Sequence, residues 1–258
     1  MRLITADDGA KINATSIGSG PLTVLFLHCL GGNVKTWAGA WGAMDLTRVR
    51  CLAFDFRGTG ESQREVCALT NERLARDALL VADAFGAESF VVVGHSMGGK
   101  VGLLLAALAP ERVRGLVLIG APGPGFVQIE RSVLDDLLAH AGDRSFAGDW
   151  FRPWFHVWPR PEIEAWIDSF VRMPAWALMA CCEAALWSSF SDAVSPLSCA
   201  VLVVAGKHDP VYGAAYQRES VLPYVPNAEV ITIEAGHGLI LERPEDVASR
   251  LDCFLERI

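Results

Sequence analysis

The chain has 258 residues, 52% of them hydrophobic and 20% charged, so it is long enough to bury a core and is neither disordered nor fibrous. Its formal net charge of −8 at pH 7 argues against nucleic acid or an anionic membrane as a partner, and no apolar run is long enough to cross a bilayer. Seven cysteines without paired spacing, and a first segment without a secretory signal, predict reduced thiols and a cytoplasmic location.

The predicted elements begin with a short hairpin at the edge of a sheet. Residues 3–5 and 11–17 read as strands, and Asp7-Asp8-Gly9 between them is a turn sequence. Apolar runs and helical patterns then alternate, which predicts a mostly parallel central sheet flanked by helices on both faces. The expected strands are Leu22–Leu27, Arg50–Phe54, Phe90–Val93, Leu116–Ile119, Ala200–Ala205 and Glu229–Ile233, and the expected helices are Asn71–Phe85, Met97–Ala109, Ala214–Val225 and Arg243–Arg257.

The alternation breaks between Gly123 and Pro196. This stretch follows a Pro-Gly-Pro-Gly sequence and is rich in helix formers and aromatic residues. We predict that residues 123–196 form a helical cap, or lid, inserted after the sixth strand, and that residues 1–122 and 197–258 form one α/β core. Six of the eight tryptophans lie in the cap: Trp150, Trp154, Trp158, Trp166, Trp176 and Trp187.

The strongest local signal is the Gly-His-Ser-Met-Gly sequence from Gly94 to Gly98, between a predicted strand and a predicted helix. This setting is typical of a nucleophile elbow, in which a serine occupies a strained turn and small neighbours let strand and helix approach. A dinucleotide fingerprint would need glycine in place of Ser96, and a phosphate-binding loop would need Ser or Thr in place of Val101. We therefore predict that Ser96 is a nucleophile; the alternative is a chance match in a glycine-rich chain.

A serine nucleophile needs a base, and the base needs an acid that orients it. His237 is the one histidine of six that follows a late predicted strand in a loop, and Asp209 follows the strand before it. The carboxyl ends of parallel strands are where active sites of open α/β sheets gather. We predict His237 as general base and Asp209 as orienting acid; the alternatives are a solvated loop histidine and a turn-forming Asp-Pro pair.

An oxyanion hole is expected where His28-Cys29-Leu30-Gly31-Gly32 follows the strand Leu22–Leu27. Backbone amides in this loop can face the active edge of the sheet, and we assign the hole to the amides of Leu30 and Met97. The alternative is a simple Gly-Gly turn.

With these motifs, the chain resembles the α/β-hydrolase superfamily over nearly its whole length. The order Ser96, Asp209, His237 is that family's order, and residues 55–62, Asp-Phe-Arg-Gly-Thr-Gly-Glu-Ser, are similar to its D-x-R-G-x-G-x-S loop. One departure is Cys29, where the family usually has glycine, because cysteine tolerates a left-handed backbone less well. The resemblance implies a cap after the sixth strand, no metal and no organic cofactor.

The leading hypothesis for function is hydrolysis of a carboxylic ester or lactone through an acyl-enzyme. The tryptophan-rich cap favours a small-molecule substrate with an apolar or aromatic group, and we expect Trp154, Trp187 and Val211 to contact it. The alternative, to which we give equal weight, is that the tryptophans merely pack the cap helices onto the core. Relatives of the same fold include C–C bond hydrolases, perhydrolases of the haloperoxidase type and hydroxynitrile lyases, and a non-catalytic receptor is a further alternative. The sequence makes no prediction of the oligomeric state.

Overall fold

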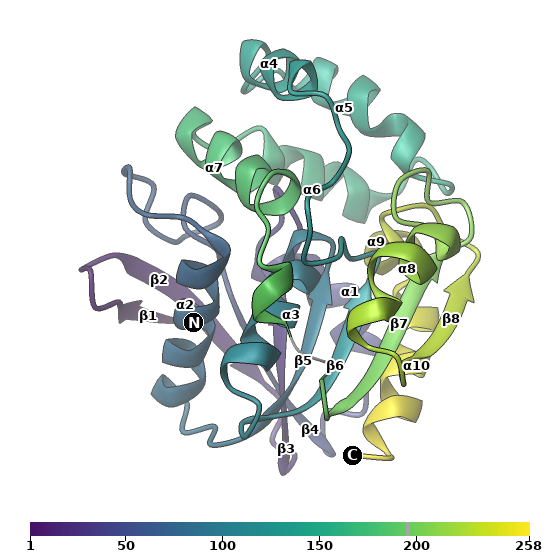
Figure 1. The fold of residues 1–258 in the computed structure, drawn as a ribbon. Coiled ribbons are helices and arrows are strands. Elements are labelled where there is room, and N and C mark those ends of the chain that lie inside the picture. The colour runs from purple at the N-terminus through teal and green to yellow at the C-terminus, as the bar shows by residue number, and fades with distance from the viewer. Residues whose placement is uncertain (195–196) are drawn as a thin grey trace.

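The computed structural model describes residues 1–194 and 197–258, so the predicted cap boundary at Pro196 lies outside the described residues. Within these ranges the core is an eight-stranded sheet with the strand order β1-β2-β4-β3-β5-β6-β7-β8 (Figure 1). The strands are β1 (Arg2–Thr5), β2 (Lys11–Ile17), β3 (Leu22–Leu27), β4 (Val49–Phe54), β5 (Phe90–His95), β6 (Val113–Ile119), β7 (Ala200–Gly206) and β8 (Glu229–Ile233).

The mostly parallel sheet predicted from the apolar runs is confirmed. Strands β3 to β8 pair in parallel, whereas β1 and β2 form an antiparallel hairpin that joins β4 through β2. All six residues of β5 are buried, as are the last six residues of β7. Uninterrupted apolar sequence is therefore found where the sheet is covered on both faces.

Helices cover both faces of the sheet (Figure 1). The pair α2 (Asn71–Ala84) and α3 (Met97–Leu108) packs together on one face, and α1 (Ala38–Ala43) packs with α10 (Pro244–Leu255) on the other. Helix α2 begins where Thr70 Oγ1 accepts a hydrogen bond from the amide of Arg73, and residues at helical spacing such as Leu74, Ala78 and Val81 are buried. Sequence periodicity thus fixes which side of the helix faces the sheet.

One predicted helix is shorter than expected. The pattern over residues 214–225 forms α8 (Ala214–Ser220), followed by a separate 3₁₀ turn at Leu222–Tyr224. Pro223 lies in that turn, and proline cannot donate the backbone hydrogen bond that would continue an α-helix. A shorter helix, α9 (Leu239–Glu242), precedes α10.

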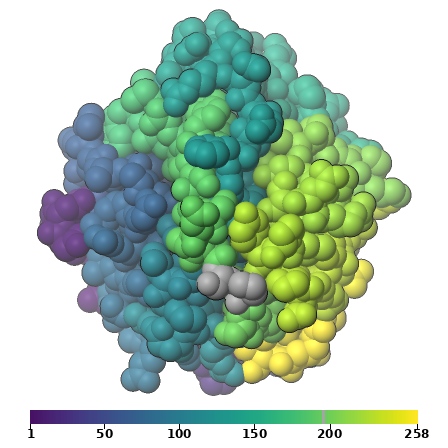
Figure 2. Space-filling view, in the orientation of Figure 1, coloured from purple at the N-terminus to yellow at the C-terminus, as the bar shows by residue number. Residues whose placement is uncertain are grey.

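Residues between β6 and β7 leave the sheet and form a group of helices, here called the insertion (Gly123–Val194 in the described residues). Its α-helices are α4 (Ser132–Ala139), α5 (Arg144–Phe151), α6 (Pro161–Phe170) and α7 (Ala175–Leu186). They lie above the sheet in Figure 1, and Figure 2 shows them in teal and green, covering that end of the molecule. None of the helices in residues 1–194 and 197–258 is long and apolar enough to cross a membrane.

A buried lysine fastens the base of the insertion to the core. Lys100, on α3, is fully buried, and its ammonium group donates hydrogen bonds to the carbonyl oxygens of Gly125, Ala185 and Ser188 at 3.0, 3.0 and 2.9 Å. Gly125 lies where the insertion begins, and the other two lie near the end of α7. One side chain therefore joins the helix after Ser96 to both ends of the insertion.

Candidate active site

Ser96 stands at a strained turn between β5 and α3. Its φ of 53° and ψ of −123° make it the one non-glycine residue with a positive φ in the described residues. A Cβ atom at Gly94 would lie 2.4 Å from the carbonyl oxygen of Gly98, and one at Gly98 would lie 2.1 Å from that of Leu27. Only glycine fits on either side, because strand, helix and the end of β3 approach so closely.

The structure brings Ser96, His237 and Asp209 together in one hydrogen-bonded chain. His237 Nε2 lies 3.0 Å from Ser96 Oγ, and His237 Nδ1 lies 2.8 Å from Asp209 Oδ2. These residues follow β5, β8 and β7, so parallel strands deliver all three to one edge of the sheet. The geometry allows proton transfer from the serine hydroxyl to a ring nitrogen that a carboxylate orients.

Asp209 is held ionised despite its burial. Its Oδ1 accepts hydrogen bonds from the amides of Val211 and Tyr212, both at 2.9 Å, while Oδ2 faces the imidazole. Burial by itself raises the pKa of this carboxyl, but the charge and hydrogen bond of His237 and the two amides outweigh it and lower the pKa below the ordinary value. A carboxylate that stays charged can stabilise an imidazolium.

The backbone of His237 is fixed on both sides. Its amide donates to the carbonyl oxygen of Trp154 at 2.6 Å, and its carbonyl oxygen lies 2.9 Å from His95 Nε2. Burial lowers the pKa of His95 to about 3, so that ring is neutral at pH 7 and its Nε2–H donates the bond. The neutral His95 therefore supports the loop of His237 without adding a second positive charge beside it.

A buried carboxylate connects the same loop to the insertion. Glu242 is fully buried, and it accepts hydrogen bonds from the amides of Gly236, His156 and Val157 at 2.9, 2.8 and 2.7 Å. Three amide donors compensate for the cost of burying this charge. The Trp154–Val157 segment and the His237 loop are consequently held together as one unit.

The loop that carries Leu30 is shaped by glycine and histidine. The left-handed residue is Gly31, with φ of 71°, and Cys29 does not have a positive φ, so cysteine at this position causes no backbone strain. His28 Nε2 accepts a hydrogen bond from the amide of Phe56 at 2.9 Å, and burial lowers the pKa of His28 to about 4. In the described residues the amides of Leu30 and Met97 have no hydrogen-bond acceptor, and both residues line the cavity next to Ser96.

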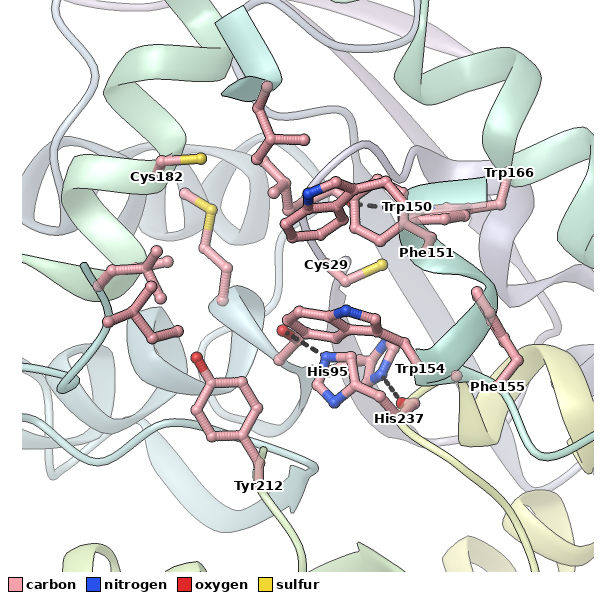
Figure 3. A pocket seen from close by; sticks show the side chains of 18 of the residues that line it. Cys29, His95, Trp150, Phe151, Trp154, Phe155, Trp166, Cys182, Tyr212 and His237 are labelled. Atoms are coloured by element: carbon pink, nitrogen blue, oxygen red, sulfur yellow. Dashed lines mark hydrogen bonds between the residues drawn. The ribbon is translucent and has the colours of Figure 1, made fainter. Parts of the chain in front are cut away.

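Ser96 and His237 line an apolar cavity. Its walls come from both the core and the insertion (Figure 3). The ring of Trp154 meets the ring of His237 edge to face, with centroids 5.2 Å apart. The hydroxyl of Tyr212 points into the cavity and has no hydrogen-bond partner in the described part of the chain. The insertion contributes a mostly aromatic and aliphatic wall: Val133, Leu137, Trp150, Phe151, Trp154 and Trp166.

Of the three predicted substrate contacts, the structure places one in the cavity. Trp154 lines it, whereas Trp187 and Val211 do not. Trp187 lies outside, where its Nε1 donates to the carbonyl oxygen of Ile129 at 3.1 Å and Arg131 stacks on its ring. The cavity is lined by Tyr212, the neighbour of Val211, and the amides of both residues donate to Asp209 Oδ1.

Comparisons with known proteins agree with this architecture. A family model described as the α/β hydrolase fold matches residues 23–137. A protein from Azorhizobium caulinodans named as a carbamate hydrolase is 34% identical over 125 residues, covering 48% of this chain and 47% of that protein, so the chain spans about half the length of this relative. A 2-hydroxymuconate semialdehyde hydrolase from a Pseudomonas species is 30% identical over 282 residues, covering 96% of this chain and 91% of that protein. The chain belongs to the α/β-hydrolase fold family.

A solved esterase structure has the same fold across its length. An esterase from Exiguobacterium antarcticum superimposes with a TM-score of 0.89 at 22% identity, covering 98% of each chain. Sequence reasoning missed three residues of the site in this α/β-hydrolase: His95 and Glu242, which hold the His237 loop, and Tyr212, which lines the cavity. Their roles depend on contacts between segments that are distant in sequence. Of the three, only His95 lies in a motif that the sequence singled out, the one around Ser96.

Proposed function

We propose that this α/β-hydrolase is a serine hydrolase that cleaves a carboxylic ester or lactone through an acyl-enzyme. The observation that carries the proposal is the hydrogen-bonded chain from Ser96 through His237 to Asp209 at the floor of an apolar cavity. A binding protein or receptor would need none of these contacts. The second supporting feature is the pair of free amides, at Leu30 and Met97, on the same cavity wall.

In the acylation step, His237 Nε2 takes the proton from Ser96 as Oγ attacks the ester carbonyl. The carbonyl oxygen gains negative charge, which the amides of Leu30 and Met97 stabilise, and each such donor contributes about 3 kcal/mol to transition-state binding. Asp209 stabilises the imidazolium, which then gives its proton to the leaving alcohol as the C–O bond breaks. In a lactone the alcohol stays attached to the acyl group.

In the deacylation step, a water molecule replaces the alcohol. His237 removes a proton from the water while the water oxygen attacks the acyl carbon. The same two amides stabilise the second oxyanion. Ser96 leaves with the proton from His237, and the carboxylic acid is released. The serine, the histidine and the carboxylate thus return to their starting states.

The cavity favours uncharged substrates. Among the described residues that line it there is no arginine or lysine, so a substrate carboxylate would lose its hydration without gaining a cationic partner. This favours neutral apolar or aromatic esters and lactones over anionic substrates. The second candidate is C–C bond hydrolysis, and a 2-hydroxymuconate semialdehyde hydrolase is among the relatives. We further infer that the insertion acts as the cap that selects among acyl and alcohol groups.

The proposal can be tested with a fluorophosphonate probe and an ester panel. We expect one covalent adduct per chain, located on Ser96 by peptide mass spectrometry, and turnover of neutral aryl and alkyl esters. Esters that carry a free carboxylate, such as a hemisuccinate, should be poorer substrates by kcat/KM. An adduct on another residue, or hydrolysis without any adduct, would overturn the serine mechanism.

Replacing Trp154 with alanine should change substrate preference, whereas the same change at Trp187 should not. Loss of an aromatic contact worth about 1–3 kcal/mol lowers kcat/KM roughly 5- to 150-fold for substrates that use it. We expect Trp154→Ala to lower kcat/KM for bulky aromatic esters by this factor and to affect acetate esters far less. Trp187→Ala removes an equal side chain from outside the cavity and serves as the control. Equal losses on both ester classes in Trp154→Ala would mean that this tryptophan is structural.

A further inference from the structure

Two histidines and a glutamate meet at the protein surface, outside the cavity beside Ser96. His156, His208 and Glu234 each offer one potential ligand atom, and these atoms lie within 4.8 Å of one another. The two imidazole rings stack at 3.8 Å between centroids with a 14° interplanar angle, and His208 Nε2 lies 2.9 Å from Glu234 Oε2. All three residues are exposed, so an ion can reach them from solvent.

The three side chains come from separate segments whose backbones are already fixed. The amide of His156 donates to Glu242 Oε2 at 2.8 Å, and the amide of His208 donates to the carbonyl oxygen of Ala235 at 3.0 Å. Glu234 lies directly after β8, and its carbonyl oxygen accepts from Arg243 Nε at 3.2 Å. Only side-chain rotations are therefore needed to change the spacing of the ligand atoms, which keeps the cost of organising a site small.

The chemistry of the three groups selects the kind of ion. Two imidazole nitrogens and one carboxylate oxygen suit Zn²⁺, whereas Ca²⁺ and Mg²⁺ prefer oxygen ligands alone. Zinc bonds of about 2.0–2.2 Å in a tetrahedron bring ligand atoms to roughly 3.3 Å from one another. Side-chain rotations that shorten the widest spacing, which is at most 4.8 Å, by up to roughly 1.5 Å would reach that value.

We propose that His156, His208 and Glu234 bind a Zn²⁺ ion, with water as the fourth ligand. Lys207 pairs with Oε1 of Glu234, while Oε2 of the same carboxylate faces His208. The ammonium of Lys207 repels a divalent cation and competes for the carboxylate. Removal of Lys207 should accordingly strengthen zinc binding at these three residues.

Such an ion would join the insertion to the core beside the active site. His156 lies two residues after Trp154, His208 directly precedes Asp209, and Glu234 lies three residues before His237. Zinc binding would add a side-chain link between the cavity wall and the loops of the acid and the base, beside the backbone bonds that Glu242 already makes. The site does not depend on ester hydrolysis, and it is tested by binding rather than by turnover.

The test is calorimetric titration of tag-free, EDTA-stripped protein with ZnCl₂ at constant pH. We expect saturable binding of one ion per chain and a higher thermal midpoint in the presence of zinc, with neither effect from MgCl₂. His156→Ala, His208→Ala and Glu234→Gln should each weaken binding by about tenfold or more, because each removes a ligand. Lys207→Ala should bind zinc more tightly than the wild type.

The matched control is His140→Ala, which removes an exposed histidine that stacks on Phe146 away from this cluster. Zinc binding should be unchanged in this variant. Circular dichroism of each variant checks the fold, since His208 adjoins Asp209 in the chain. The site would be overturned if the wild type showed no saturable zinc binding, or if the three ligand variants bound zinc as tightly as the wild type. It would also be overturned if His140→Ala lost as much zinc affinity as the ligand variants.

Discussion

Replacing Ser96, the proposed nucleophile, with alanine is expected to lower ester turnover by roughly 10⁴- to 10⁶-fold, in line with nucleophile knockouts in known serine hydrolases. The change removes the oxygen that lies 3.0 Å from His237 Nε2 and leaves the remaining groups in place. Alanine occupies the left-handed turn at φ 53° about as poorly as serine, so the free energy of unfolding should change little. Residual activity would come from the amides of the proposed oxyanion hole.

The measurement is steady-state hydrolysis of a neutral aryl ester, with circular dichroism and thermal unfolding as checks on the fold. Ser189→Ala is the matched control, because this serine is exposed and lies outside the cavity. It should keep full turnover and full fluorophosphonate labelling, whereas Ser96→Ala should lose both. Turnover of Ser96→Ala within tenfold of wild type would rule out Ser96 as the nucleophile.

Replacing Asp209 with asparagine is expected to lower kcat by about 10⁴-fold, because it reverses the hydrogen bond to the imidazole. The asparagine oxygen can still accept the amides of Val211 and Tyr212, so the turn should persist. Its NH₂ group then donates to His237 Nδ1, which forces the ring proton onto Nε2. A ring nitrogen that already carries a proton cannot accept one from Ser96.

This variant also has a stability signature. The lowered pKa of Asp209 means that its carboxylate stabilises the fold above about pH 4, and that this contribution disappears as pH falls below the ordinary carboxyl range. The difference in free energy of unfolding between wild type and Asp209→Asn should therefore shrink on acidification. Asp149→Asn, at an exposed position on α5, is the control for both measurements. Unchanged kcat in Asp209→Asn would refute the orienting role.

The sequence was sufficient to predict the mostly parallel sheet and to predict that three residues lie close together at its edge. Ser96, Asp209 and His237 each follow an apolar run, and parallel strands place the residues at their carboxyl ends together. The short helix α1 (Ala38–Ala43) gives no such signal, because its two glycines weaken the helical pattern and tertiary packing supplies its stability.

The cavity wall could not be predicted from residue type. Trp154 and Trp187 lie in the same tryptophan-rich stretch, yet of these two only Trp154 lines the cavity. The difference depends on where the insertion contacts the core, which Lys100 and Glu242 determine through bonds to residues far away in sequence. Burial of charged side chains at such contacts has no periodic pattern that a single sequence reveals.

The buried carboxylate of Glu242 has a consequence for protein engineering. Insertions of this kind are attractive units to exchange between homologous enzymes when a new specificity is wanted. Here, two of the three amides that Glu242 accepts from belong to the insertion, at His156 and Val157. A transplanted segment with proline at either place, or with a backbone path that turns these amides away, would take donors from the buried carboxylate, and losing both would leave Gly236 as its one amide donor, at a cost of several kcal/mol. Chimeras should therefore keep residues 154–157 from the recipient chain and exchange only the helices on either side.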